Sequence, residues 1–160
     1  MAEQGKKLIA SNRRARHDYS ILEEVEAGMV LRGSEVKSLR LGHVQINDGY
    51  ARIVNGEMWL EGVNISAYSF AQGFGAHLPD QQRKLLLKRY EIDRLEARVN
   101  QERLTLIPLS IYFKDGRAKI ELGLAKGRTK GDKRQVLAER DADREIQKAM
   151  VRYRKGKGVD

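Results

Sequence analysis

The charge of residues 126–160 constrains the fold of this chain more than any other feature. The segment holds 12 basic and 6 acidic residues, few apolar ones, and glycines near both of its ends. Such a composition buries too little apolar surface to offset the entropy lost on ordering the backbone. We therefore expect a basic C-terminal tail that is disordered in isolation, with the globular fold upstream of it.

The charge of the remaining chain is divided unevenly as well. Residues 1–16 carry five basic residues and one acid, and the whole chain has a formal charge of +9, which leaves −1 for residues 17–125. Two basic arms on a nearly neutral body favour a polyanionic partner. Nucleic acid is favoured over a membrane surface, because no stretch combines a broad apolar face with a basic one.

The absence of cysteine excludes disulfides, thiolate zinc sites and cysteine nucleophiles. No apolar run of the signal-peptide kind begins the chain. The longest apolar stretch, 104–113, is far shorter than the roughly 20 residues that cross a bilayer. We expect a soluble, cytoplasmic protein without a membrane partner.

Apolar periodicity predicts a mainly β body. β-type residues and alternation predict strands over residues 19–31, 51–54, 57–63, 64–70, 105–113 and 117–124. Apolar spacing predicts a helix over 35–40 with Ser34 as its N-cap, and another over 81–99 with Asp80 as its N-cap. Short antiparallel strands with interspersed helices indicate a small OB-like barrel with peripheral helices.

Glycine and proline mark the irregular points of this barrel. Asn55-Gly56 predicts a two-residue hairpin turn. Gly28 predicts a bulge or bend in the first strand, and Pro108 places its strand at an edge or a bulge. The expected division is a flexible basic lead over 1–11, the barrel with its helices over 12–125 and the basic tail over 126–160.

The tail contains a latent helix. Asp132 is a candidate N-cap, and a thin apolar stripe follows at helical spacing, formed by Ala142, Ile146, Ala149, Met150 and Tyr153. One thin stripe is marginal in water. Folding of this helix on a partner is favoured, with docking on the barrel through Ile146 and Met150 as the alternative.

Catalytic and metal-binding patterns are absent. His17, His43 and His77 have no metal-ligand spacing, and no glycine-rich phosphate loop occurs. Asp48, Glu57 and Glu61 could serve as the acids of a small hydrolase or nuclease, although surface solvation explains them more simply. We therefore expect no enzyme, no cofactor and no metal, with that nuclease as the alternative.

Basic and aromatic side chains together suit RNA. Lysine and arginine bind phosphates with an affinity that falls as salt rises. Rings near the basic clusters could stack on unpaired bases, with core packing as the alternative for each; they are His17, Tyr19, Phe74, His77, Tyr90 and Tyr153.

Several motifs, in order, resemble one family. They are NRRARHDY at residues 12–19, GSEVKSLR at 33–40, RKLLL at 83–87, and AKG at 125–127 followed by DKR at 132–134. Together they resemble the bacterial SsrA-binding protein family, also called small protein B, over about residues 8–155.

This resemblance implies a non-catalytic adaptor built on an OB-like barrel. Members bind the tRNA-like domain of transfer-messenger RNA, aid its alanylation and deliver it with elongation factor Tu to stalled ribosomes. The tail enters the decoding centre of the small subunit and the empty message channel, where it becomes helical.

The resemblance also implies site residues. The RNA-facing ones are Asn12, Arg13, Arg14, His17, Glu26, Lys37, Arg83, Lys84, Leu86 and Gly127. The ribosome-facing ones are Lys126, Arg128, Lys130, Asp132, Lys133, Arg134, Ile146, Met150 and Arg152. The chemistry of the residues alone does not explain Glu26, an acid on a face that binds RNA.

The chain departs from the family pattern at two places. Members often carry a histidine or another ring directly before Asp-Lys-Arg, where this chain has Gly131. After RKLLL they usually have a histidine and a basic pair, whereas this chain has Lys88-Arg89-Tyr90. We therefore expect charge and helix docking, more than ring stacking, to hold the tail.

Overall fold

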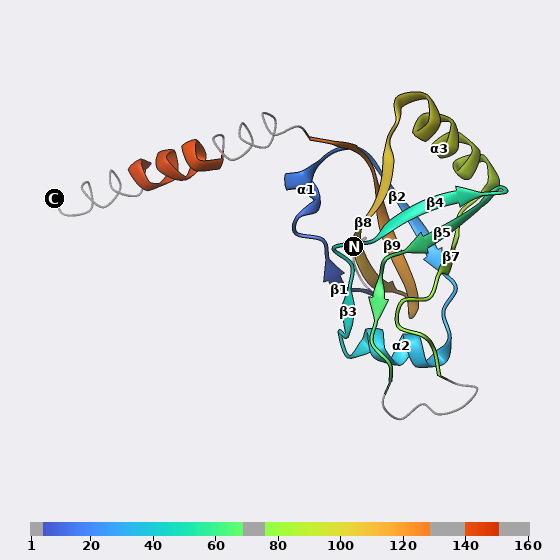
Figure 1. Ribbon diagram of the computed structural model, residues 1–160. Helices are drawn as coiled ribbons and strands as arrows, with labels where there is room; N and C mark the ends of the chain where they lie inside the picture. Colours follow the sequence, from blue (N-terminus) through green and yellow to red (C-terminus); the bar gives the residue numbers. More distant parts are fainter. Residues whose placement is uncertain (1–4, 69–75, 129–139, 151–160) are drawn as a thin grey trace. The chain divides into compact units, whose positions relative to one another are not determined.

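The computed structural model describes residues 5–68, 76–128 and 140–150 (Figure 1). By its contacts the chain divides into two units, Met1–Gly127 and Arg128–Asp160. The elements of the first unit are β1 Lys6–Ser11, α1 Ala15–Asp18, β2 Tyr19–Met29, α2 Gly33–Arg40, β3 Val44–Gln45, β4 Tyr50–Val54, β5 Glu57–Glu61, β6 Asn64–Ile65, β7 Arg83–Leu86, α3 Arg89–Glu102, β8 Thr105–Lys114 and β9 Arg117–Gly127.

Six of these strands close into a barrel. The pairing order is β8-β4-β5-β7-β2-β9, and β9 pairs back with β8, so the antiparallel ring has no open edge within it. α2 and α3 lie at opposite ends of the barrel (Figure 1). The predicted OB-like barrel with peripheral helices is confirmed.

Strand β8 joins the most neighbours. It pairs with β9 along its whole length, while its other edge is shared by β4, at Leu106, and by β1, from Ser110 to Lys114. The register against β9 shifts between Pro108 and Ser110. Proline has no N–H to donate, so the ladder between β8 and β9 breaks next to Pro108. At the same point the partner on the other edge of β8 changes from β4 to β1. The irregularity predicted at Pro108 is confirmed.

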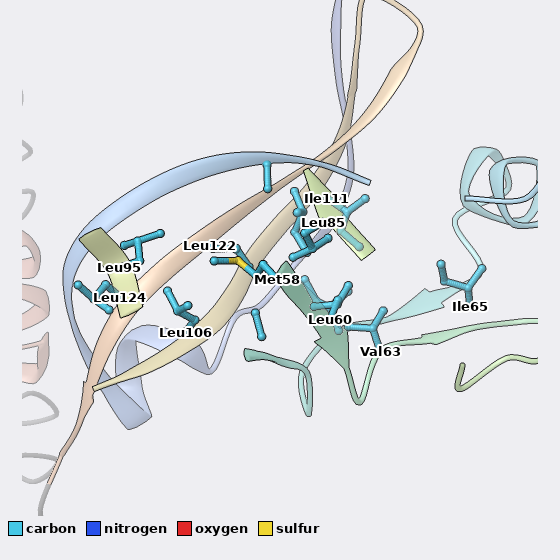
Figure 2. Close-up of a cluster of buried hydrophobic side chains, with 14 of the residues drawn as sticks. Met58, Leu60, Val63, Ile65, Leu85, Leu95, Leu106, Ile111, Leu122 and Leu124 are labelled. Atoms are coloured by element: carbon cyan, nitrogen blue, oxygen red, sulfur yellow. The ribbon is translucent and has the colours of Figure 1, made fainter. Parts of the chain in front are cut away.

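Aliphatic side chains from all sides of the ring fill the barrel (Figure 2). The side chains that are fully or almost fully buried include Met58, Leu60, Leu85, Leu95, Leu106, Ile111, Ile120, Leu122 and Leu124. The hairpin between β4 and β5 turns at Asn55 and Gly56, whose φ angles are 51° and 75°. Both values suit the predicted two-residue turn.

Strand β1 corrects the flexible lead predicted over residues 1–11. Lys6 lies opposite Lys114 and Ser11 opposite Ser110, in an antiparallel pair with β8. Ile9 packs against the core. The edge of β8 beyond Pro108 carries backbone groups that β4 does not reach, and β1 pairs with them. The prediction is therefore wrong for residues 6–11.

Strand β7 corrects the first part of the helix predicted over 81–99. Arg83 and Leu85 are buried, whereas Lys84 and Leu86 are not, which is the two-residue period of a strand. Leu85 also fits the helical spacing of the apolar residues of α3, and for this reason the predicted helix began too early, at residue 81.

The helix that follows begins later than predicted. α3 starts at Arg89, and the N–H of its N-cap Lys88 donates to Oε1 of Glu91 at 3.2 Å. The predicted N-cap, Asp80, instead accepts a hydrogen bond from Nδ2 of Asn64 at 2.8 Å.

Gly28 makes a close approach, and of the bulge or bend predicted there the bulge is not formed. It stays in register with Lys119 on one side and Leu86 on the other, and the irregular point of β2 lies between Ile21 and Glu23. A Cβ at Gly28 would stand 3.3 Å from Cβ of Leu86. The missing side chain therefore lets β7 come close to β2.

The start of α2 and the strand after β5 also differ from prediction. α2 begins at Gly33 with Arg32 as its N-cap, and the side chain of Ser34 is buried. The strand predicted over 64–70 is formed only at Asn64–Ile65, which pairs with the unpredicted β3; residues 69 and 70 lie outside the described part.

A buried ion pair ties α2 to β7. The side chains of Glu35 and Arg83 are each 1% exposed, and Nε of Arg83 donates to Oε2 of Glu35. Nη1 of Arg83 donates to the carbonyl of Val63 at 2.8 Å, and Nη2 to that of Pro79 at 2.9 Å. Oε1 of Glu35 accepts the N–H of Arg32 at 2.9 Å. Both charges are thus hydrogen-bonded, as burial requires.

Replacing Arg83 by methionine should leave Glu35 buried without a countercharge. We expect Arg83→Met to lower the free energy of unfolding by about 3–5 kcal/mol, measured by urea denaturation. The matched control is Arg89→Met, which removes an exposed pair with Asp93 on α3 and should cost less than about 0.5 kcal/mol. Equal losses in the two variants would contradict this role of the buried pair.

Candidate nucleic-acid interface

One end of the barrel gathers the basic residues of the NRRARHDY motif. Ala15 of α1 is 2% exposed and packs in a small cluster with Ile107, Leu109 and Ala125. This contact holds the single turn of α1 against the barrel. Arg13 and Arg14, just before this turn, are exposed. The motif thus presents two guanidinium groups on a short, anchored segment.

The end of β9 lies at the same place. Gly127 pairs with Tyr19 and Lys126 with Ser20, at the first residues of β2. Among the described residues, none has an atom within 4 Å of a Cβ built at Gly127. The structure therefore brings together six of the predicted residues, which are Asn12, Arg13, Arg14, His17, Lys126 and Gly127.

A second group of predicted residues lies on β7 and α2. Leu86 is 53% exposed beside Gly28. Nζ of Lys84 lies 3.7 Å from Glu57. Lys37, on α2, places its Nζ 5.3 Å from the ring centroid of Tyr68. These side chains come from elements other than α1 and form a separate surface.

Glu26 gains a physical explanation from the strand register. The hydroxyl of Tyr112 on β8 donates to Oε2 of Glu26 on β2, and Nζ of Lys114 lies 3.6 Å from the same oxygen. These contacts, the tyrosine bond first, lower the pKa of Glu26 although its burial raises it. Glu26 is therefore a fixed, ionised acceptor on the outer surface.

Sequence reasoning missed the contact of Tyr112 with Glu26. Tyr112 is 2% exposed, and Nζ of Lys6 stands 4.3 Å from the centroid of its ring. Burial, with the bond to Glu26, raises the pKa of its hydroxyl, so it stays a hydrogen-bond donor. From the sequence alone, core packing is the obvious interpretation of Tyr112. Its partner Glu26 lies two strands away in the sheet, so the sequence gives no sign of their contact.

Arg83 does not belong to the surface. Its side chain is 1% exposed and its nitrogens donate to Glu35 and to backbone carbonyls. Its assignment as an RNA-facing residue is therefore replaced by a structural role. His77, suggested as a stacking ring, is also buried: Nδ1 lies 2.8 Å from Oγ of Ser34, and Nε2 lies 2.9 Å from the carbonyl of Ile65.

The ribosome-facing prediction is only partly covered by the described residues. Residues 140–150 are helical, and Ile146 and Met150 are 54% and 55% exposed there. Within this helix, Nη1 of Arg144 lies 4.0 Å from Oδ1 of Asp141. Arg128 is described at the start of this unit. The other predicted tail residues lie outside the described part; they are Lys130, Asp132, Lys133, Arg134 and Arg152.

The three carboxylates of the alternative nuclease do not meet. Glu57 and Glu61 stand at opposite ends of β5, where they pair with Lys84 and Arg52. Asp48 lies in the turn before β4. No cluster of three potential metal ligands occurs within residues 5–68, 76–128 and 140–150. None of the helices in these ranges is long and apolar enough to span a membrane.

Removing the hydroxyl of Tyr112 should remove the hydrogen bond that contributes most to the lowered pKa of Glu26. Tyr112→Phe is expected to raise the pKa of Glu26 toward 4.5, its ordinary value, as followed by carboxyl NMR titration. The pKa of Glu26 is lower in the folded protein than in the unfolded chain. Its contacts therefore stabilise the fold at pH values above the ordinary pKa, and this stabilisation is lost as the pH falls through the folded pKa. The stability gap between wild type and variant should therefore narrow in acid. Tyr90→Phe, at an exposed ring, is the control; a Glu26 titration unchanged by Tyr112→Phe would contradict the contact.

Comparison with known proteins agrees with this geometry. The sequence profile described as SmpB protein matches residues 9–152. The chain is 56% identical over 155 residues to the SsrA-binding protein of Nocardioides sp., covering 96% of each chain. It is 54% identical to the SsrA-binding protein of Frankia casuarinae, covering 97% of each.

A solved structure supports the same relationship. A chain from the structure described as "tmRNA-SmpB: a journey to the center of the bacterial ribosome" superposes with a TM-score of 0.63 at 45% identity, covering 80% of this chain and 93% of that one. This family is one of RNA-binding adaptors and not of enzymes. On the matched profile and the near full-length relatives, the chain belongs to the SmpB protein family of SsrA-binding proteins.

Proposed function

We propose that this protein is a non-catalytic adaptor that binds the tRNA-like domain of transfer-messenger RNA and delivers it to stalled ribosomes for trans-translation. One observation carries the proposal. Exposed Arg13 and Arg14 stand beside the end of β9, at one end of a closed barrel, in a chain more than half identical to SsrA-binding proteins.

We assign contacts with phosphate and contacts that fix the orientation of the RNA to different residues. Arg13, Arg14 and Lys126 supply charge at one end of the barrel, where it attracts the backbone of a folded RNA. Lys84 and Leu86 offer a cation and an exposed apolar side chain elsewhere on the surface. Glu26, kept ionised by Tyr112, can accept hydrogen bonds from base amino groups or ribose hydroxyls.

The tail is proposed to act on the ribosome. Its basic residues suit ribosomal RNA, and the helix of residues 140–150 exposes Ile146 and Met150 for docking in the decoding centre and empty message channel. Gly131 in place of a ring leaves charge and helix docking as the means of binding. Elongation factor Tu is the proposed delivery partner, and the cytoplasm, where ribosomes work, the proposed location.

Binding to the tRNA-like domain should depend strongly on salt and on the two arginines of the NRRARHDY motif. We expect Arg13→Gln with Arg14→Gln to weaken binding and to reduce the slope of log affinity against log salt by roughly 1.5, about 0.7–0.9 for each lost phosphate contact. Fluorescence anisotropy at several salt concentrations measures both quantities.

The control for this charge change is Arg89→Gln with Arg98→Gln, which removes two positive charges from α3. It should change the slope little. An unrelated RNA of equal length is the second control. If wild-type protein binds that RNA as tightly as the tRNA-like domain, the proposed function is wrong.

Ending the chain after Arg128 should separate the two activities. The barrel with β9 is one compact unit, so we expect RNA affinity to stay within about threefold of the full chain, while peptide tagging on stalled ribosomes is lost. Tagging assays with purified ribosomes measure the second effect. Retained tagging, or loss of RNA binding in a folded truncated protein, would contradict the proposed division of labour.

A further inference from the structure

A polar hollow lies beside α1. Two adjoining cavities, of about 200 Å³ and about 370 Å³, share the lining residues Asn12, Asp18, Tyr19, Asn47 and Asp48. Arg14, Ala15 and Gln45 complete the first cavity. The two cavities therefore adjoin, between the NRRARHDY motif on one side and the turn before β4 on the other.

One residue that lines the hollow, Asn12, holds an unsatisfied acceptor. Oδ1 of Asn12 is buried and has no hydrogen-bond partner among the described residues. The amide orientation is fixed, because Nδ2 donates to the carbonyl of Pro108 at 3.0 Å, and a reversed amide would set two oxygens against each other. The backbone N–H of Asn12 donates to the carbonyl of Leu109 at 2.8 Å. A buried acceptor in this state favours a ligand that brings a donor.

The opposite wall of the hollow is rigid. The N–H of Gly49 donates to the carbonyl of Ile46 at 3.0 Å, and Ile46 is buried. A Cβ at Gly49 would stand 2.6 Å from Val63, and one at Gly62 would stand 2.6 Å from the carbonyl oxygen of Asp48. Such close backbone approaches hold Asn47 and Asp48 in place before any ligand binds.

The chemistry of the lining selects one kind of ligand. Asp48 is exposed, and within residues 5–68, 76–128 and 140–150 its carboxylate makes no hydrogen bond or ion pair, whereas Asp18 is engaged by Nδ1 of His17 at 2.9 Å. A free carboxylate and a buried amide oxygen together favour a group with several adjacent donors. Arg14 adds a cation at the mouth, suited to a phosphate or a base carbonyl.

Guanine fits this set better than the other bases. Its Watson–Crick edge carries N1–H and the N2 amino group side by side, which can donate together to one carboxylate. Adenine and cytosine place a ring acceptor beside their amino group, and uracil flanks its single N–H with two carbonyls. The ring of Tyr19 on the wall offers a surface for stacking.

We propose that the hollow beside α1 binds one extruded guanine of the bound RNA, with Asp48 and Oδ1 of Asn12 accepting its donors. The proposal rests on the proposed function, since it takes the RNA as given and names a base-specific site within it. It adds sequence selectivity to a surface whose charges alone recognise only phosphate.

The test is a double-mutant cycle on affinity. Each unpaired guanosine of the tRNA-like domain is replaced in turn by inosine, which lacks the N2 amino group, and binding is measured to wild type and to Asp48→Asn. We expect one position at which inosine weakens wild-type binding about tenfold, whereas the variant binds the guanosine RNA about tenfold more weakly and shows little further loss with inosine. Asp48 is exposed, so the variant should fold normally; circular dichroism checks this.

The matched control is Asp93→Asn, at an exposed carboxylate on α3, which should leave every inosine effect unchanged. The inference is overturned if no guanosine couples to Asp48, or if Asp48→Asn binds the natural RNA as wild type does. Failure of the proposed function has a different signature, in which wild-type protein does not distinguish the tRNA-like domain from an unrelated RNA.

Discussion

The buried pair between Glu35 and Arg83 is the interaction on which the working surface of this protein depends. A guanidinium removed from water needs every donor satisfied, and here carbonyls from the segments around Val63 and Pro79 join the carboxylate of α2 in doing so. The arrangement fixes β7 with Arg83 inward. Because strand side chains alternate, Lys84 and Leu86 must then face outward, so one buried charge decides which residues of the RKLLL motif reach the surface.

Pairing within the barrel explains why the positive charge is effective only at particular places. Glu23 is paired with Arg94, Glu24 with Arg16, and Glu61 with Arg52. These exposed pairs contribute little stability, but they cancel charge locally. Arg13 and Arg14 have no such acidic partner within the described ranges, so their positive charge is not cancelled locally. Glu26 differs from the other acids in that the buried Tyr112 donates to it, in addition to its contact with Lys114.

Local signals in the sequence predicted the parts of the fold that local chemistry determines. Asn55-Gly56 sets its hairpin through positive φ angles, and Pro108 breaks its ladder through a missing N–H. Features that depend on distant partners were not predictable. β1 forms because one edge of β8 is otherwise unpaired, and Arg83 is buried because the buried carboxylate of Glu35 accepts its hydrogen bond. The site divides in the same way, since Arg13 and Arg14, directly before α1, are visible in the sequence, whereas the contact between Tyr112 and Glu26 requires the register of three strands.

Strand β9 links the two proposed tasks of the protein. It pairs with β8 and β2 within the closed ring, and its last residues, Lys126 and Gly127, pair with Ser20 and Tyr19 of β2 beside α1. The point where the tail leaves the barrel is therefore held by backbone hydrogen bonds next to the two exposed arginines. An RNA bound there lies beside the start of the tail, so the orientation of that RNA and the origin of the tail are fixed together. The barrel thereby fixes the point at which the tail begins, at Gly127.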